Sequence, residues 1–306
     1  MLFSIIIPTY NRADFLPRAI TSVMSQMLED WELVIVDDGS TDNTKETVLP
    51  FLKDSRISYH YQENAERSAA RNKGISLAKG DFVCFMDSDE YMLKEHLENL
   101  NKAISALDNQ VGVYVFNIGF DYVFDSSKNY TRRAIPFQNP INPNQLIDVI
   151  IGAPQLCLHR QVFEKEVFNV DLVVGEDTEL LFRFSHWFPF FYIDEKPTLF
   201  ELEHENRSVA NKSLSAEKQL KTLKVMFSGN HPANRVSVNK KRWLLSEVYL
   251  IASIDYLYDM RLNGLSYLLL SLWKNPSSNK TKYKLNLLIR FLLGQKNNLQ
   301  KLLKQE

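Results

Sequence analysis

Several residue types and patterns are scarce in this sequence. Its 306 residues include only two cysteines, Cys84 and Cys157, together with ten glycines and eleven prolines. Two cysteines without a Cys-x-x-Cys pair exclude a disulfide framework, and their apolar neighbours predict small buried side chains in a reducing compartment. The modest glycine and proline content, without any low-complexity stretch, argues against disorder. We therefore expect a folded protein with an ordinary core.

Long hydrophobic runs are also absent. Runs such as Leu268-Leu269-Leu270 are interrupted within a few residues, whereas a membrane-spanning helix needs about 20 apolar residues. No basic segment precedes the first apolar run, so the sequence predicts no signal peptide. These features predict a cytoplasmic protein whose contact with a membrane, if any, is peripheral and on the inner face.

The charge is unevenly distributed, although the formal net charge is only -1. Residues 212–306 hold 17 Lys or Arg and 5 Asp or Glu, a net charge of +12, whereas residues 1–211 hold 19 basic and 32 acidic residues, a net charge of -13. A basic surface favours nucleic acid or an anionic membrane. Because no recognisable nucleic-acid module accompanies it, we expect no nucleic-acid partner and favour membrane contact. A homodimer interface is the alternative use of the same region.

The N-terminal part alternates short apolar runs with stretches of helical spacing. Strands are predicted at residues 4–7, 33–36, 57–61, 82–86 and 111–120, with helices at 14–27, 68–79, just before Val48 and after Gly175. Strands that alternate with helices predict an α/β fold with a mostly parallel sheet and right-handed crossovers. After about residue 214 the spacing is helical throughout. We expect two domains, residues 1–212 and a basic helical region at 213–306.

Polar motifs follow three of the predicted strands. They are Pro8-Thr9-Tyr10-Asn11, Asp37-Asp38 and Asp87-Ser88-Asp89. Ligands of open parallel sheets bind beyond the carboxyl ends of the strands, so the three motifs are expected to share one rim. The polar stretch at residues 125–143 is expected to be a loop or lid that closes over a ligand.

The strongest motif is Asp87-Ser88-Asp89. Two carboxylates at positions i and i+2 beside a turn suit a hard divalent cation, which prefers oxygen ligands and leaves positions for phosphate oxygens. The alternative is a solvated turn, because Asp and Ser are common turn residues. The motif alone leaves both interpretations open.

Each remaining motif also has a plain structural alternative. Asp38 accepts a base N–H or caps a helix, and Tyr10 stacks on a nucleobase or lies in the core. The basic segment around Arg71 forms ion pairs with the acidic rim or approaches a phosphate, and its plain alternative is a surface helix that ends at a glycine. The pair Glu176-Asp177 supplies a general base or stabilises a helix dipole, and His204 is a metal ligand or an exposed side chain.

Taken together and in this order, these motifs resemble the family 2 glycosyltransferases, which have the GT-A fold. The resemblance covers roughly residues 3–210 and rests on five segments: Ser4 to Arg12, Val36 to Asp42, Ala70 to Gly74, Asp87 to Asp89, and Gly175 to Asp177. It implies a Rossmann-like, mostly parallel sheet flanked by helices, with the helical C-terminal region as an appendage.

The resemblance also implies a role for each residue. Nucleotide-binding residues would be Pro8, Thr9, Tyr10, Asn11, Asp38, Asn64, Arg71, Asp87 and Ser88. Asp38 would bind the uracil, and Asp87 would approach the ribose or donor sugar. Asp89 and His204 would bind Mn²⁺ or Mg²⁺. Asp177, beside Glu176, would deprotonate the acceptor hydroxyl.

The implied function is inverting transfer of a hexosyl or N-acetylhexosaminyl group. The donor would be a nucleotide diphosphate sugar, with UDP favoured, and the acceptor a glycan or lipid-linked molecule of cell-envelope polysaccharide synthesis. A dinucleotide-dependent dehydrogenase is disfavoured, because no Gly-x-Gly-x-x-Gly follows the first strand, and no Walker pattern occurs. The alternative is a catalytically inactive nucleotide-sugar-binding module of the same fold.

Overall fold

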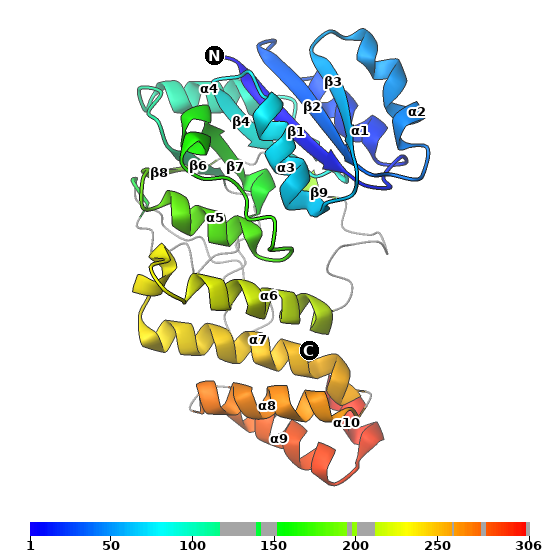
Figure 1. Ribbon diagram of the computed structural model, residues 1–306, viewed down its shortest axis with the longest axis vertical. Coiled ribbons are helices and arrows are strands. Elements are labelled where there is room, and N and C mark those ends of the chain that lie inside the picture. The colour runs from blue at the N-terminus through cyan, green and yellow to red at the C-terminus, as the bar shows by residue number, and fades with distance from the viewer. Residues whose placement is uncertain are drawn as a thin grey trace. The chain divides into compact units, whose positions relative to one another are not determined.

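A computed structural model describes residues 1–116, 139–141, 152–194, 198–200, 212–258, 260–276 and 280–303. The chain divides into two units. The N-terminal unit comprises Met1–Phe124 and Thr131–Glu203, and the C-terminal unit comprises Asp125–Tyr130 and His204–Glu306. The first unit contains a twisted sheet flanked by helices and the second is helical (Figure 1). This confirms the predicted α/β fold with a helical C-terminal appendage.

Seven strands of the N-terminal unit form one sheet in the order β3-β2-β1-β4-β7-β6-β8. Their bounds are β1 Phe3–Thr9, β2 Trp31–Asp38, β3 Ile57–Gln62, β4 Phe82–Phe85, β6 Val113–Phe116, β7 Leu156–His159 and β8 Phe190–Ile193. The pairs β1–β2, β1–β4, β2–β3 and β6–β8 are parallel, and β7 is antiparallel to both β4 and β6. Strands β5 (Glu90–Met92) and β9 (Thr198–Phe200) form a separate antiparallel pair.

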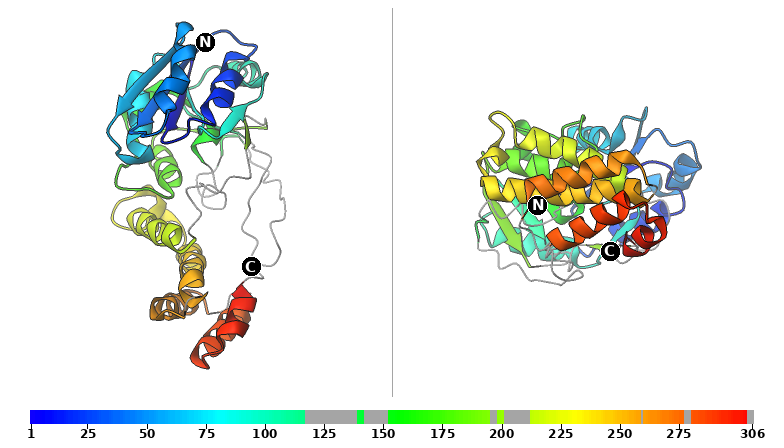
Figure 2. Two further views of the ribbon diagram at one scale, coloured as in Figure 1. Left: turned by 90° about the vertical axis from the view of Figure 1, so that its right-hand side faces the viewer. Right: turned by 90° about the horizontal axis from the view of Figure 1, so that it is seen from below.

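Helices cover both faces of the sheet (Figures 1 and 2). They are α1 Leu16–Met24, α2 Thr44–Val48, α3 Glu66–Leu77, α4 His96–Ser105 and α5 Glu176–Phe184, with short 3-10 helices at Leu49–Lys53, Ala153–Gln155 and Arg160–Glu164. Alternate strand residues point to opposite faces. Thus Phe3, Ile5 and Ile7 pack in one core cluster with α1 and α4, and each fully buried side chain of that size contributes about 1.5–3 kcal/mol.

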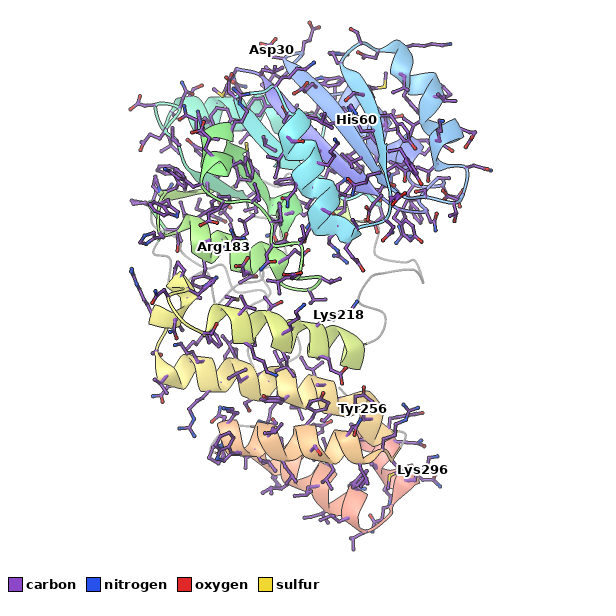
Figure 3. The ribbon with its side chains drawn as sticks, in the orientation of Figure 1. Asp30, His60, Arg183, Lys218, Tyr256 and Lys296 are labelled. Atoms are coloured by element: carbon purple, nitrogen blue, oxygen red, sulfur yellow. The ribbon has the colours of Figure 1, made fainter. Side chains whose placement is uncertain are left out.

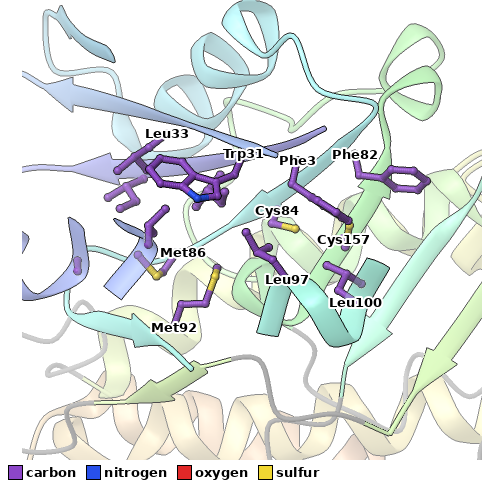
Figure 4. Packing of buried hydrophobic residues seen from close by; sticks show 14 of the residues in the cluster. Phe3, Trp31, Leu33, Phe82, Cys84, Met86, Met92, Leu97, Leu100 and Cys157 are labelled. Atoms are coloured by element: carbon purple, nitrogen blue, oxygen red, sulfur yellow. The ribbon is translucent and has the colours of Figure 1, made fainter. Parts of the chain in front are cut away.

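The same cluster contains the two cysteines (Figure 4). Cys84 of β4 pairs in register with Cys157 of β7 across the antiparallel ladder. Both are free and buried, as the sequence predicts. Burial, together with the neighbouring Cys84 thiol, raises the pKa of the Cys157 thiol well above its usual value, so both behave as small apolar side chains.

On the other face, α3 lies directly against the central strands. A Cβ atom on Gly74 would collide with the side chain of Ile6. Only glycine therefore permits this close approach of helix to strand. The packing fixes α3 relative to the carboxyl ends of β1 and β2, where the predicted nucleotide-binding residues lie.

Predicted and observed bounds differ by a few residues. The helix expected at residues 14–27 is α1, which ends at Met24, where Ser25 bonds back to the last turn. The helix expected from residue 68 begins at Glu66, and the strand expected at 111–120 begins at Val113. The expected lid at 125–143 lies outside the described residues, except for 139–141.

The C-terminal unit consists of α6 Lys212–Met226, α7 Val238–Tyr258, α8 Leu262–Lys274, α9 Thr281–Leu292 and α10 Lys296–Leu303, with a 3-10 helix at Pro232–Arg235. Its core is a leucine-rich cluster shared by α7, α8, α9 and α10. A buried cation also lies here: Lys284 Nζ donates to Ser246 Oγ (2.7 Å). None of the described helices is long and apolar enough to cross a membrane. The boundary and roles of the two predicted domains stay predictions.

Candidate functional site

The carboxyl ends of β1, β2 and β4 lie together at one edge of the sheet. Thr9 pairs in register with Asp37, and the Met86 amide donates to the Ile6 carbonyl (3.0 Å), one residue before Asp87. The strand order therefore brings together three motifs that are far apart in sequence, as parallel pairing requires.

The Asp37-Asp38 pair at the end of β2 is held by specific donors. Both Asp37 oxygens are engaged, since Oδ1 accepts from the Ser40 amide (2.8 Å) and Oδ2 from the Tyr59 hydroxyl (2.5 Å). Burial, with the bond to Asp37, raises the pKa of Tyr59, which keeps the phenol protonated as a donor. Asp37 therefore stabilises the loop after β2 and is not the carboxylate that would accept from a ligand.

Asp38 is arranged differently. Its Oδ1 accepts from Gln62 Nε2 (2.7 Å) and from the Ala65 amide (2.9 Å). The side chain is 4% exposed, so the carboxylate is fixed in position with one oxygen committed to the chain. This leaves Oδ2 as the atom through which Asp38 would accept from a ligand.

The loops after β1, β2 and β3 are tied to one another. Asn11, at φ 51, receives the Thr41 amide on its Oδ1 (2.8 Å) and donates its own amide to Ser40 Oγ (2.9 Å). Gly39 has φ 85, and a Cβ there would lie 2.8 Å from the Asn64 amide nitrogen. Glycine is thus required twice over, for its dihedral angle and for the approach of Asn64.

The β1 end offers an aromatic face. Tyr10 is 47% exposed, so it is not the core residue that was the structural alternative. Thr9 is buried, and its Oγ1 has no hydrogen-bond partner among the described residues. An exposed ring beside a fixed carboxylate loop is the arrangement that a planar heterocycle can stack on.

Arg71 of α3 is the centre of a second group of residues. Its guanidinium is 2% exposed and contacts three carboxylates: Nη2 donates to Asp87 Oδ1 (3.2 Å), and Nη1 donates to Glu176 Oε1 (3.0 Å) and Asp177 Oδ1 (3.1 Å). The Phe168 ring covers the guanidinium, with its centroid 5.3 Å away. Arg71 therefore connects the end of β4 with the start of α5. Its predicted contact with the nucleotide stays a prediction.

Asp177 lies in the first turn of α5, which begins after Gly175 at φ 78. Burial raises the pKa of Asp177 to about 7, against the lowering effect of Arg71, and the nearby charges of Glu176 and Asp87 raise it further. A carboxyl group with a pKa near neutrality exchanges a proton readily at that pH, as a general base must. The helix dipole alone would explain acidic residues here, but not a raised pKa.

The segment before α5 is bound to α3 through its backbone. Asn72 Nδ2 donates to the Phe168 carbonyl (2.9 Å), and the Phe168 amide donates to Asn72 Oδ1 (2.9 Å). Ser68 Oγ donates to the Leu172 carbonyl (3.1 Å). These three bonds place the start of α5 at a fixed distance from Arg71.

Asp87 and Asp89 are the residues of this rim that could take part in holding a divalent cation. The Asp87-Ser88-Asp89 segment is a tight turn in which the Glu90 amide donates to the Asp87 carbonyl (3.0 Å), and both carboxylates are partly exposed. Mg²⁺-type sites commonly use one or two carboxylates and complete their shell with substrate phosphates. Within the described part of the chain, no group of three His, Cys, Asp or Glu residues suits a metal, and His204 lies outside that part.

The predicted residues thus fall into two groups, a loop group around Asp38 and a carboxylate group around Arg71. Sequence reasoning missed the supporting residues Tyr59, Gln62 and Asn72. Gln62 directly follows the strand predicted at residues 57–61, which is the one signal that could have placed it at the same rim. The Asn72–Phe168 bonds join residues 96 apart, and no local pattern indicates them.

Comparison with known proteins gives the family. The family model described as glycosyl transferase family 2 matches residues 4–168, which is more than half of the chain. An uncharacterised glycosyltransferase of Rickettsia conorii is 43% identical over 176 residues, which cover 57% of this chain and 28% of that protein. The chain therefore spans well under two thirds of the length of that relative.

Two solved structures share the fold. Residues 1–349 of S. aureus TarS, in complex with UDP-GlcNAc, align with a TM-score of 0.62 at 17% identity, covering 99% of this chain and 91% of that one. The mannosyltransferase PcManGT of Pyrobaculum calidifontis, in complex with GDP-Man and Mn²⁺, aligns with a TM-score of 0.59 at 17% identity, covering 98% and 84%.

Proposed function

Since the chain belongs to the glycosyl transferase family 2, we propose that it transfers a sugar from a nucleotide diphosphate donor, with UDP favoured, to a hydroxyl group. The observation that supports this most directly is the carboxylate group around Arg71. There Asp177, whose pKa is raised, contacts the same guanidinium as Asp87, which lies just after β4. The predicted fold and the nucleotide sugars named for TarS and PcManGT agree with it.

We assign donor recognition to the loop group. The Tyr10 ring would stack on the base while Asp38 Oδ2 accepts a base N–H, and an immobile carboxylate loses little freedom in doing so. Pro8, Thr9, Asn11 and Asn64 would shape the pocket around them. Asp87 and Ser88 would face the ribose or donor sugar.

We assign the divalent cation, Mn²⁺ or Mg²⁺, to Asp89, with His204 as a second ligand. When bound, the cation would neutralise charge on the leaving diphosphate. PcManGT binds Mn²⁺, which supports the assignment, as does the oxygen-rich turn at Asp87-Ser88-Asp89.

Asp177 is the proposed base, with Glu176 beside it. The acceptor hydroxyl gives its proton to the Asp177 carboxylate as its oxygen bonds to the anomeric carbon of the donor. The bond from that carbon to the phosphate oxygen breaks with its electron pair on the diphosphate, so the anomeric configuration inverts. Arg71 holds Asp177 in place and remains charged, because burial lowers its pKa less than its three carboxylate neighbours raise it.

The acceptor is proposed to be a glycan or lipid-linked molecule of cell-envelope polysaccharide synthesis, with a hexosyl or N-acetylhexosaminyl group as the sugar. A cytoplasmic location with peripheral membrane contact through the basic helices would suit a lipid-linked acceptor. A catalytically inactive nucleotide-sugar-binding module is the second candidate, because fold and motifs alone do not establish chemistry.

Calorimetry with UDP tests donor binding. We expect Mn²⁺-dependent binding that falls at least about tenfold in Asp38→Ala, because one buried, charge-assisted hydrogen bond is lost. Asp54→Ala is a control, since Asp54 also forms hydrogen bonds but lies at the opposite end of β3. Equal binding with and without Mn²⁺ would remove the cation from the proposal. A thermal-shift screen of nucleotide sugars with Mn²⁺ would identify the donor.

The two candidate functions differ in turnover. We expect release of UDP from the identified donor to accelerate when glycan or lipid-linked acceptors are added. Donor binding without any sugar transfer across such acceptors would favour the inactive module.

A further inference from the structure

The last three helices have an unusual charge composition. Residues 260–305 contain nine Lys or Arg and no Asp or Glu. Such a segment carries a positive potential that no acidic side chain of its own offsets. Helices α8, α9 and α10 lie entirely within it.

Two of these helices also expose apolar side chains in rows. On α8, Leu262, Leu269 and Trp273 are 73%, 48% and 67% exposed. Their spacings of seven and four residues place them along one side of a helix. A soluble protein normally covers such a row or leaves its members scattered.

Helix α9 repeats the arrangement. Leu285, Ile289, Leu292 and Leu293 are each at least 44% exposed, and their spacing again places them on one side of the helix. The opposite side, with Leu287 and other members of the leucine-rich cluster, packs inward. We name the exposed residues of α8 and α9 together the apolar rows.

One cation lies against a residue of the apolar rows, and other cations of α9 and α10 are exposed. Lys274 Nζ lies 4.4 Å from the Trp273 ring centroid, and Arg242 Nε of α7 donates to the Lys274 carbonyl (3.0 Å). Lys282 of α9 and Lys296 of α10 are exposed, and Lys296 is labelled in Figure 3. Trp and Lys side by side suit a membrane interface, where the indole enters the headgroup layer and the ammonium stays hydrated.

We propose that the apolar rows of α8 and α9 insert into the interface of an anionic bilayer, with the flanking cations bound to lipid phosphates. Apolar insertion and headgroup attraction are the two signals that together give stable peripheral binding. This docking surface does not depend on the proposed transferase chemistry, because vesicle binding and nucleotide binding are measured separately.

The charge and the apolar rows together favour a bilayer over other occupants. A nucleic acid would use the cations but leave the leucines in water. In a symmetric dimer the same surface meets itself, so the acid-free segments of two copies would repel. An anionic lipid surface offers an apolar layer and a negatively charged layer at once.

Flotation of the full chain with phosphatidylcholine vesicles, with and without phosphatidylglycerol, tests the proposal. We expect flotation only with the anionic vesicles, weakened by added salt. The triple variant Leu269→Ser, Trp273→Ser, Ile289→Ser should bind anionic vesicles at least about tenfold more weakly. Burial of even one such apolar side chain changes the affinity by about that factor. Lys282→Glu with Lys296→Glu should reduce the preference for anionic lipid.

Trp187→Ser is the matched control. Trp187 is 52% exposed and has Lys165 Nζ 5.6 Å from its ring centroid, but it belongs to the N-terminal unit and should leave flotation unchanged. No flotation of the wild type with anionic vesicles would overturn the proposal. So would equal flotation of wild type and triple variant. Light scattering that shows a wild-type dimer lost in the triple variant, without flotation, would assign the apolar rows to a second copy.

Discussion

The two units of the chain use charge in opposite ways. In the N-terminal unit, several carboxylates are buried and accept from specific donors, such as Tyr59 for Asp37 and Arg71 for Glu176. In the C-terminal unit many cations, such as Lys218 and Lys282, are exposed, and Lys274 lies against the exposed ring of Trp273. The near-zero net charge of the whole chain hides this division. We propose separate tasks for the two units: positioning of groups within a site in one, and contact with another surface in the other.

Removal of the proposed base should have the largest effect. We expect Asp177→Asn to lower the rate of sugar transfer by about 10²–10⁴, the usual contribution of a general base, while UDP affinity stays nearly unchanged. Initial rates and calorimetry on the same preparation measure both. Transfer at the wild-type rate would remove Asp177 from the mechanism.

Arg71→Met should strongly destabilise the N-terminal unit. It leaves the 3% exposed Glu176 side chain without its main counter-charge, and breaking such a buried pair costs about 3–5 kcal/mol. Urea unfolding with nucleotide absent measures the loss. Arg71→Lys, which keeps the charge but cannot reach three carboxylates, should fall between Met and wild type. An unfolding free energy equal to wild type would show that the pair is not coupled to folding.

The pH dependence of sugar transfer tests the role of Asp177 as the base. Because burial raises the pKa of Asp177 to about 7, the active carboxylate form grows as pH rises, and the rate should climb to a plateau above pH 7. The linked effect on stability has the opposite sign. The folded state binds the Asp177 proton more tightly than the unfolded state, whose Asp177 has the ordinary pKa of 3.8. The contribution of Asp177 to the free energy of unfolding therefore falls as the pH rises from 3.8 to about 7.

Arg71 also affects the pH at which the transfer rate rises. Its charge lowers the pKa of Asp177, so in any folded Arg71→Met protein the rate should rise at a higher pH than in the wild type. A wild-type rate that rises with its midpoint near pH 4 would contradict the raised pKa of Asp177.

The smallest effect is expected from the buried cation of the C-terminal unit. Lys284 is fully buried and donates to one hydroxyl group, and burial lowers its pKa. Lys284→Met removes an ammonium group whose desolvation opposes folding, so the free energy of unfolding should change by no more than about 1 kcal/mol, in either direction. If Lys284→Met lowered the free energy of unfolding as much as Arg71→Met, the buried cations of the two units would contribute equally to stability.

The sequence predicts β1 to β4 and β6, their order along the chain and the shared rim, because each of these strands is a β-branched or aromatic run. It does not indicate α4 or the antiparallel strand β7. Leu156-Cys157-Leu158 is too short for its period to separate a strand from any other buried segment, and its direction depends on partners 73 residues away.

Within the site too, a local sequence pattern does not indicate contacts between residues that are far apart in the chain. Asp87, Glu176 and Asp177 are visible as carboxylate pairs beside turns. An ion pair between the Arg71 segment and the acidic rim is one alternative that the sequence offers, and Arg71 does contact Asp87. The contacts of Arg71 with Glu176 and Asp177 are not indicated, because these residues lie 105 and 106 positions later. A basic helix turn has the same sequence whether it faces phosphate, solvent or buried carboxylates.

The paired bonds between Asn72 and the Phe168 backbone have a consequence for how the chain can change in length. They make Phe168 a fixed point, and Arg71 makes Glu176 another, so the residues between them must span a set distance. An insertion before Phe168 can loop outward, whereas one between Phe168 and Glu176 would turn Asp177 away from the rim. Length variation is therefore expected on the N-terminal side of Phe168 and not between Phe168 and Glu176.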